Sequence, residues 1–434
     1  MAMIIKKETS SHVTLEGGFT MYTPREFTKI ALCKYVDPAL EKESYDVILT
    51  EMDGFQISWL KEPETTLEMQ EFLNLMYMYI EITEKGFTAR ELPADQHISG
   101  LSDQSIWLKD VQGISKLGIV DNTRHDIYKL LYKTFMRVAE KLGFTSVLNM
   151  SRKEFKKIVI PLFYNGEHKL FETLEDTEAK KFLEIYKHFF PLAEGFRHAC
   201  LNCWNETSKF DYWMLPDGYE VKCTHRSTSE VLGFEWNGFK FYGKCKQVKA
   251  LPKMTRTERS EYRTPGTRSL AANITHSIDA WVQREVKYRC AMTKARAAYI
   301  LNECRGINPD YTEDAKLTAV IDKTVETGIT SARLFWMLEK NPHRLPEHVK
   351  DNLREIIKEL PTEAFCPVSV HDEFSVHPKY MNALRWEFNC ILSQLYRGWI
   401  QHYFNKQLSM NVKVGVGDSA TAEAIKNWNY GLVL

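Results

Sequence analysis

Three short groups of residues, spread along the chain in a fixed order, constrain its fold more than any other feature of the sequence. The first group spans residues 95–100, the second comprises Arg152, Lys156 and Tyr164, and the third spans residues 370–374. The first contains Asp95 and the third contains Asp372. Because most of the chain separates these two carboxylates, only tertiary folding can bring them together. The pattern therefore predicts a site assembled by a large, well-packed fold.

The residue types in these groups are the ones that nucleotidyl transfer needs. Two carboxylates, Asp95 and Asp372, can hold two Mg²⁺ ions, which activate a chain-end hydroxyl and neutralise pyrophosphate. Residues four apart are neighbours on a helix, so Arg152 and Lys156 form a cationic face for a triphosphate, with Tyr164 within about 120° of Arg152. Taken alone, each Asp is better interpreted as a helix cap or a turn residue. Likewise, the helix that carries Arg152 and Lys156 could simply expose a basic face to solvent. Together, the groups predict a polymerase with two Mg²⁺ ions as cofactors.

The composition sets broad limits on the class of protein. The chain has 434 residues, of which 44% are hydrophobic, so it can bury a large core. Lys and Arg together number 57, as do Asp and Glu, which argues against a histone-like wrapper but allows a basic cleft. Nine scattered cysteines are typical of a reducing compartment, and no apolar run approaches a membrane span. These features predict a soluble cytoplasmic protein with no membrane partner, in the host cytoplasm if the protein is viral.

Hydrophobic periodicity predicts a mostly helical α+β fold with a small antiparallel sheet beneath the carboxylates. Residues 1–60 are expected to be irregular apart from a helix start at Thr23. Asp95 should end a connection or lie on a short strand, and Pro161 should loosen the end of the helix that follows Ser151. Helices are expected at 65–84, from Asp121 or Asn122 to Gly143, from Ser151 onward, within 169–207, from about 269 to 360, and at 379–404. A hairpin or small sheet is expected within 210–249, and a strand at 366–370.

A basic segment, residues 244–268, adjoins the predicted hairpin. It is interleaved with Met254 and Tyr262, which favours a nucleic-acid contact over a solvated loop. Glu258 and Glu261 are its only acidic residues. Its cations are Lys244, Lys246, Lys249, Lys253, Arg256, Arg259, Arg263 and Arg268.

The motifs resemble those of the single-subunit, phage-type DNA-dependent RNA polymerases. Asp95-x3-Ser99-Gly100 matches that family's first palm motif, and Arg152-x3-Lys156-x7-Tyr164 matches its fingers helix, although Asn165 replaces a Gly. His371-Asp372 matches the second palm motif, with Glu373 in place of the usual Ser. Residues 215–218 resemble the turn of the hairpin that the family uses around promoter DNA. Residues 272–279 resemble a further family segment that includes His276, with Ala272 in place of Pro.

The resemblance implies roles for individual residues. Asp95 and Asp372 would bind the two Mg²⁺ ions, while Lys156 and Arg152 would hold the incoming triphosphate. Lys156 is also a candidate for protonating the leaving pyrophosphate. Tyr164, Ser99 and Gly100 would contact the incoming nucleotide, and His276 would help to recognise its 2′-hydroxyl. The implied partners are a DNA template, nascent RNA and ribonucleoside triphosphates. Glu373 is more typical of family A DNA polymerases, so that class remains an alternative, as does an inactive nucleic-acid-binding subunit.

The resemblance also implies a domain organisation and a missing part. Only 94 residues precede Asp95, and they contain no Gly-Arg pair, whereas the family has such an element and a large N-terminal domain there. The chain thus resembles the larger subunit of a split phage RNA polymerase, and we expect a second subunit to supply the missing elements. The expected parts are a partner-binding region (1–60), palm segments (61–120 and 361–434), fingers (121–207), a hairpin with the basic segment (208–268), the His276 helix (269–294) and a helical insertion (295–360).

Overall fold

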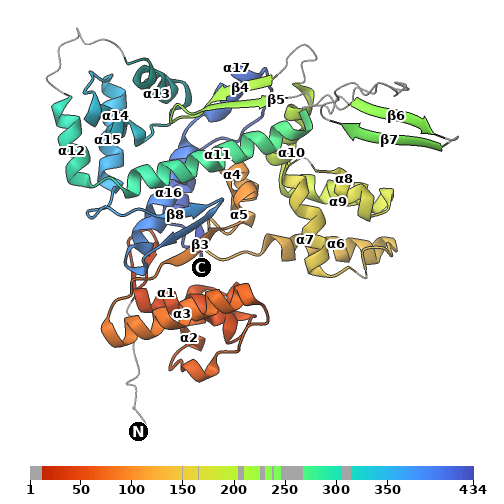
Figure 1. Ribbon diagram of the computed structural model, residues 1–434, viewed down its shortest axis with the longest axis horizontal. Helices are drawn as coiled ribbons and strands as arrows, with labels where there is room; N and C mark the ends of the chain where they lie inside the picture. Colours follow the sequence, from red (N-terminus) through yellow and green to blue (C-terminus); the bar gives the residue numbers. More distant parts are fainter. Residues whose placement is uncertain are drawn as a thin grey trace.

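The computed structural model describes residues 12–148, 150–164, 166–203, 210–224, 230–236, 239–245, 267–304 and 314–434. Helices dominate, and a small antiparallel sheet lies between groups of helices (Figure 1). The expected class, mostly helical α+β with a small antiparallel sheet, is therefore confirmed. No helix within these described ranges is long and apolar enough to cross a membrane.

The sheet joins the first quarter of the chain to its end. Its strand order is β10-β3-β9-β8, and every neighbouring pair is antiparallel. Asp95 pairs with Glu373 on one side and with Val433 on the other. The strands are β3 (Leu92–Gln96), β8 (Val368–Val370), β9 (Glu373–Val376) and β10 (Leu432–Val433).

Three helices pack against one another to form the centre of the main core. They are α4 (Ser99–Trp107), α11 (Thr267–Cys290) and α16 (Met381–Arg397). Trp107, Trp281 and Phe388, one from each helix, are fully buried. These large side chains are tightly packed where the three helices meet. The packing holds α4 and α11 in fixed positions relative to the sheet. Two further helices, α17 (Ile400–Leu408) and α18 (Ser419–Lys426), complete the C-terminal part.

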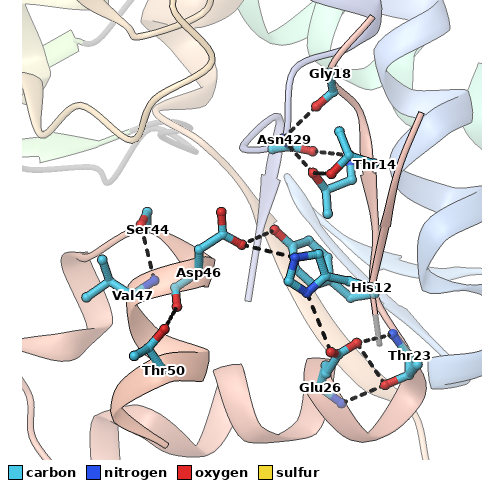
Figure 2. A network of polar contacts seen from close by, with 12 residues as sticks. His12, Thr14, Gly18, Thr23, Glu26, Ser44, Asp46, Val47, Thr50 and Asn429 are labelled. Atoms are coloured by element: carbon cyan, nitrogen blue, oxygen red, sulfur yellow. Dashed lines mark hydrogen bonds and ion pairs between the residues drawn. The ribbon is translucent and has the colours of Figure 1, made fainter. Parts of the chain in front are cut away.

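The N-terminal region docks onto the C-terminal segment through buried polar contacts. The Thr20 amide donates to Asn429 Oδ1 at 2.7 Å, and Asn429 Nδ2 donates to the Gly18 carbonyl at 3.0 Å (Figure 2). The buried Arg385 donates to the Thr20 carbonyl at 3.0 Å and packs over the rings of Phe19 and Tyr22. This region comprises β1 (Val13–Thr14), β2 (Thr20–Met21), α1 (Pro24–Leu32), α2 (Tyr45–Glu51) and α3 (Thr66–Lys85), with short 3-10 turns at Cys33–Tyr35, Leu40–Lys42 and Ile57–Trp59.

A second group of helices follows α4. The expected helix after Ser151 is α7, which begins with a capping box formed by Ser151 and Glu154. Its end is loosened at Pro161, where α7 gives way to a 3-10 helix, Ile160–Tyr164. Pro161 cannot donate the hydrogen bond that another α-turn would need. The helices of this group are α5 (Val111–Lys116), α6 (Ile127–Leu142), α7 (Arg152–Val159), α8 (His168–Thr173), α9 (Asp176–Phe189) and α10 (Pro191–Asn202).

Two antiparallel hairpins follow, within the predicted hairpin region. They are β4 (Phe210–Met214) with β5 (Glu220–Thr224), and β6 (Glu230–Trp236) with β7 (Phe239–Cys245). The turn of the first hairpin is held in place rather than projecting freely. The buried Asp217 accepts two hydrogen bonds from Arg284, at 2.6 and 3.2 Å, and Gly218 adopts a φ of 74°.

A second, smaller hydrophobic core extends from Met292 to Leu360. It corresponds to the segment expected as a helical insertion, and the network around Arg289 connects it to the main core. Its helices are α12 (Lys294–Glu303), α13 (Ala315–Thr327), α14 (Arg333–Lys340) and α15 (Glu347–Glu359).

Three local expectations differ from the structure. Residues 12–60 contain helices and 3-10 turns rather than mainly irregular chain. The cap of α6 is Asp126, not Asp121 or Asn122, because Asp126 Oδ1 accepts from the Lys129 amide at 2.9 Å. The helix expected at 379–404 is broken at Gly398, where an added Cβ would lie 2.5 Å from Ile329 Cγ1. The chain turns there so that α17 can pack on β4.

Candidate active site

The fold places Asp95 and Asp372 on neighbouring parts of the sheet. Asp95 lies on β3, and Asp372 lies in the two-residue turn that joins β8 to β9. The Gln96 amide donates to the Asp372 carbonyl at 3.1 Å, which ties the turn to β3 directly beside Asp95. Glu373, the next residue, is the direct cross-strand partner of Asp95. Three carboxylates therefore gather at one end of the sheet.

The backbone is strained beside both aspartates. Ile98, three residues after Asp95, has a φ of 53°, and His371, one residue before Asp372, also has a φ of 53°. This left-handed region is unfavourable for a residue with a Cβ, and most of all for a β-branched one such as Ile. Strain of this kind persists only where the surrounding structure enforces it, and it concentrates at functional sites. Strained residues therefore lie both after β3, at Ile98, and in the β8–β9 turn, at His371, and they mark this end of the sheet as a candidate site.

The sequence groups line one cavity of about 320 Å³. The β3–α4 connection contributes Ser99 and Gly100 at the start of α4. The helix α7 contributes two cations, because the four-residue spacing of Arg152 and Lys156 places both on one face. The 3-10 turn after Pro161 then carries Tyr164 to the wall of the same cavity. The predicted site residues in its lining are Asp95, Ser99, Gly100, Arg152, Lys156, Tyr164 and Asp372.

The carboxylates repel one another across this cavity. Burial raises the pKa of Asp95 to about 6, and the charges of Asp372 and Glu373 add to the increase, whereas Lys156 opposes it. Asp95 is nevertheless open to the cavity, so its carboxylate can meet a ligand there. A cation between Asp95 and Asp372 would relieve this repulsion.

The donor chemistry of the two aspartates fits Mg²⁺, which prefers carboxylate and phosphate oxygens. Among the residues that the structure describes, no group of three or more His, Cys, Asp or Glu side chains is arranged to hold a metal ion. Two carboxylates alone still suit Mg²⁺, because this ion usually takes one or two protein carboxylates and completes its shell with water and substrate phosphates.

Tyr164 packs closely against the start of α4. A Cβ on Gly100 would lie 2.3 Å from Tyr164 Oη and 2.7 Å from Cζ, so only glycine admits the ring in this position. Burial, reinforced by Asp103, raises the pKa of Tyr164 to about 12, although a hydrogen bond with Ser99 acts in the opposite direction. His276 on α11 lies against Tyr164, with 4.9 Å between ring centroids and 41° between the ring planes. The structure thus brings His276 next to the cavity through Tyr164.

A buried glutamine, not anticipated from the sequence, connects the segments that carry Tyr164 and His276. Gln104 on α4 donates through Nε2 to the Phe163 carbonyl at 2.7 Å and to Thr275 Oγ1 at 3.0 Å. Phe163 precedes Tyr164, and Thr275 precedes His276. Nothing in the sequence around Gln104 distinguishes it from other polar residues on a helix, so only the tertiary structure reveals it.

Two further acids interact near Asp372: the buried Asp103, which was not anticipated, and the half-buried Asp279, which ends the segment 272–279. Gln96 Nε2 donates to Asp103 Oδ1 at 2.6 Å, and Asp103 Oδ2 is buried without a hydrogen-bond partner. Burial raises the pKa of Asp103 well above its ordinary value, with a further contribution from Asp279. Burial likewise raises the pKa of Asp279 to about 6, with Asp372 adding to it. Both shifts favour the protonated acid, and both come in part from the crowding of carboxylates near Asp372.

Further polar residues of the cavity could not be identified from the sequence. Lys42, Arg124, His125 and Asp126 all contribute to its lining. Asp126 forms an ion pair with Arg152, so one of the two predicted triphosphate ligands already has a carboxylate partner. Lys156 instead lies over the ring of Tyr128, with Nζ 4.9 Å from the ring centroid.

Part of the predicted nucleic-acid segment lies outside the described residues. This applies to Lys246, Lys249, Lys253, Arg256, Arg259 and Arg263, and to Asn165 beside Tyr164. The backbones of Lys244 and Arg268 belong to β7 and α11. The nucleic-acid role of this segment stays a prediction.

Comparison with known proteins adds no identification, since neither protein-family models nor curated proteins gave a match to this chain.

Proposed function

We propose that this chain is the catalytic subunit of a DNA-directed RNA polymerase, extending an RNA 3′ end with ribonucleoside triphosphates on a DNA template. One observation carries the proposal. Residues that are far apart in sequence, Asp95 and Asp372 with Arg152, Lys156 and Tyr164, line a single cavity. Paired carboxylates, phosphate-binding cations and an aromatic side chain in one place suit two-metal phosphoryl transfer, and the order of the three groups along the chain favours a polymerase within that class. In this proposal the sheet belongs to the palm, and α7 belongs to the fingers.

Each residue has a role in the proposed reaction. Asp95 and Asp372 would hold Mg²⁺, which when bound lowers the pKa of the chain-end hydroxyl and neutralises phosphate charge. Lys156 binds the triphosphate and donates a proton to the leaving pyrophosphate. Arg152 binds phosphate through its planar fork after exchanging Asp126 for the substrate. Tyr164, held against Gly100, forms the wall beside the incoming sugar.

Three features favour a ribonucleotide substrate over a deoxyribonucleotide. Gly100 leaves no side chain between α4 and Tyr164. Ser99 and Tyr164 are hydrogen-bonding neighbours, and His276 lies against the Tyr164 ring. A site with polar groups for a 2′-hydroxyl disfavours a sugar that leaves those groups unsatisfied.

Two other functions have support from particular observations. Glu373 lies opposite Asp95 and supports a family A DNA polymerase. The ion pair between Arg152 and Asp126 supports a nucleic-acid-binding subunit without activity, because it occupies a cation that catalysis would need.

The proposal includes a second polymerase subunit as partner. The resemblance to a split enzyme supports it, as do exposed apolar side chains in the N-terminal region. Val13, Ile57 and Trp59 are 60%, 41% and 41% exposed, respectively. A partner that covered them would bury apolar surface, as protein interfaces commonly do.

Substitution of the two aspartates tests the proposal. We expect Asp95→Ala and Asp372→Ala each to reduce ribonucleotide incorporation by at least about a thousandfold, because several kcal/mol of charge stabilisation is lost. Template affinity, measured by fluorescence anisotropy with a labelled DNA, should stay within about twofold. Asp322→Ala, an exposed aspartate on α13, is the matched control. Near-normal elongation by either cavity variant would remove that residue from the proposed metal site.

A further inference from the structure

The cavity has a second source of positive charge outside α7. Arg124 lies in the loop between α5 and α6, and Lys42 ends the 3-10 turn Leu40–Lys42 of the N-terminal region. Both side chains line the same cavity as Asp95, Asp372 and Lys156. Residues from three separate parts of the chain therefore add cations to one cavity.

The loop that carries Arg124 is held from two sides. Asn122 donates to the Gly18 carbonyl at 3.0 Å and accepts from the Asn429 amide at 2.8 Å. His97 Nε2 donates to the His125 carbonyl at 3.1 Å. The loop is thus fixed both to the N-terminal region and to the β3–α4 connection. An arginine on such a loop has a defined position at the cavity wall, which is how binding sites are usually preorganised.

No carboxylate among the described residues is paired with Arg124. Its Nη1 donates to the Glu43 carbonyl at 3.3 Å, which is neutral and uses one of five N–H donors. Within the described ranges, Arg124 forms no ion pair, whereas Arg152 is paired with Asp126. Lys42 is paired with Glu41 at 2.6 Å, but both are exposed, and such surface pairs are weak. Like Lys156, which also forms no ion pair with the described residues, Arg124 is therefore available to accept an anionic ligand in this cavity.

Neighbouring groups respond to the same charge. Burial lowers the pKa of His97 to about 4, and Arg124 and Lys42 both contribute to that decrease. His97 is consequently neutral near pH 7, which leaves it as a donor to the His125 carbonyl. It adds no further positive charge beside Arg124.

We propose that Arg124, assisted by Lys42, forms a phosphate-binding subsite of this cavity, distinct from the Arg152–Lys156 pair on α7. The inference rests on the proposed function for its physiological ligand, but the subsite itself requires only phosphate oxygens. Guanidinium groups bind phosphate through two parallel hydrogen bonds, and an arginine without a carboxylate partner is available to do so. Either the triphosphate of a nucleotide or the backbone of a nucleic-acid strand can supply those oxygens.

Binding measurements on the full chain, without nucleotide incorporation, test the subsite. The first probe is inorganic tripolyphosphate, titrated by calorimetry, and the second is a fluorescein-labelled single-stranded oligodeoxynucleotide, followed by anisotropy. Arg124→Gln keeps a donor for the Glu43 carbonyl and removes the charge, while Arg124→Lys keeps the charge and removes the fork. Arg137→Gln, an exposed arginine on α6, is the matched control. Thermal melting of each variant checks that the N-terminal region remains docked.

We expect Arg124→Gln to weaken one probe by about tenfold or more, with Arg124→Lys intermediate and Arg137→Gln unchanged. Lys42→Gln should weaken the same probe by a smaller factor. Loss of tripolyphosphate binding assigns the subsite to the triphosphate, and loss of oligonucleotide binding alone assigns it to the strand backbone. Equal binding of both probes by wild type and Arg124→Gln would overturn the proposal, as would no binding of either probe by the wild type. If the chain together with its partner incorporates no nucleotide but Arg124→Gln still weakens a probe, the polymerase proposal fails and the subsite stands.

Discussion

At the scale of single residues, the candidate site depends on positions where only one side chain fits. Gly100 is the clearest case, because Tyr164 occupies the space that any Cβ would need. Ile98 and His371 show the opposite situation, since both hold a left-handed conformation that a glycine would adopt at less cost. The surrounding sheet and helices impose these conformations and thereby fix the β3–α4 connection after Asp95 and the turn that carries Asp372.

Replacement of Gly100 tests the contact with Tyr164. In Gly100→Ala the new methyl group would overlap the Tyr164 ring end, so the ring must swing away from Ser99. We expect the ratio of ribonucleotide to deoxyribonucleotide incorporation to fall by about tenfold, with Tyr164→Phe changing it in the same direction. The rate ratio on a primed template provides the measurement. Gly195→Ala, on α10 with no atom near the added Cβ, is the control. An unchanged ratio in Gly100→Ala would exclude Tyr164 from sugar selection.

At the scale of secondary-structure elements, the local signals in the sequence predicted much of the structure. The helix starts at Thr23 and Ser151, the loosened helix end at Pro161 and the strand position of Asp95 depend on residues close in sequence. Gln104, Arg124 and Lys42 could not be predicted in the same way. These residues belong to the site because folding places them next to residues more than fifty positions away in the sequence. The residues beside them in the sequence form no periodic pattern or motif that would identify them.

Gln104 provides a test of how α4 organises the site. Gln104→Met keeps a similar volume but leaves the Phe163 carbonyl without its buried donor, at a cost of about 1–3 kcal/mol in unfolding free energy. We expect Tyr164 and His276 to lose their fixed relation, so sugar discrimination should fall while KM for the triphosphate changes little. Chemical denaturation and steady-state kinetics measure the two effects. Gln407→Met removes an exposed glutamine hydrogen bond, to Tyr212, and should leave both quantities unchanged. If Gln104→Met discriminated between ribonucleotides and deoxyribonucleotides as well as the wild type does, Gln104 would not position Tyr164 and His276.

At the scale of the whole molecule, a buried charge network joins the two hydrophobic cores. Arg289 on α11 donates to Glu285 at 3.0 Å, to Glu359 of α15 at 3.3 Å and to Gln394 of α16 at 2.8 Å. Glu387 lies 3.7 Å from the same guanidinium, and both of its oxygens are buried without a hydrogen-bond partner. Glu387 is therefore the member of this network that least favours its charged form.

This network predicts a pH-dependent stability. Burial raises the pKa of Glu387 to about 7 in the folded protein, whereas its ordinary value is 4.5. The unfolded chain thus releases this proton at lower pH than the folded chain does. The contribution of Glu387 to stability is complete below pH 4.5 and is lost as the pH rises through 7.

Glu387→Gln, which stays neutral, should therefore gain in melting temperature relative to wild type between pH 5 and pH 8. Calorimetric melting across that range gives the comparison, with the exposed Glu303→Gln as control. If the difference in melting temperature between Glu387→Gln and the wild type did not change with pH, the raised pKa of Glu387 would be contradicted.

The central claim is that this cavity performs template-directed ribonucleotide transfer. The most direct measurement is incorporation of labelled nucleotides on a primed single-stranded DNA template, with Mg²⁺, by the purified chain alone and by the chain co-purified with its physiological partner. We expect template-dependent extension with ribonucleotides, far weaker extension with deoxyribonucleotides, and activity only when the partner is present. Preference for deoxyribonucleotides would contradict the assignment of RNA as product, and full activity of the isolated chain would contradict the split enzyme. Binding of template with no incorporation in either preparation would contradict the central claim itself.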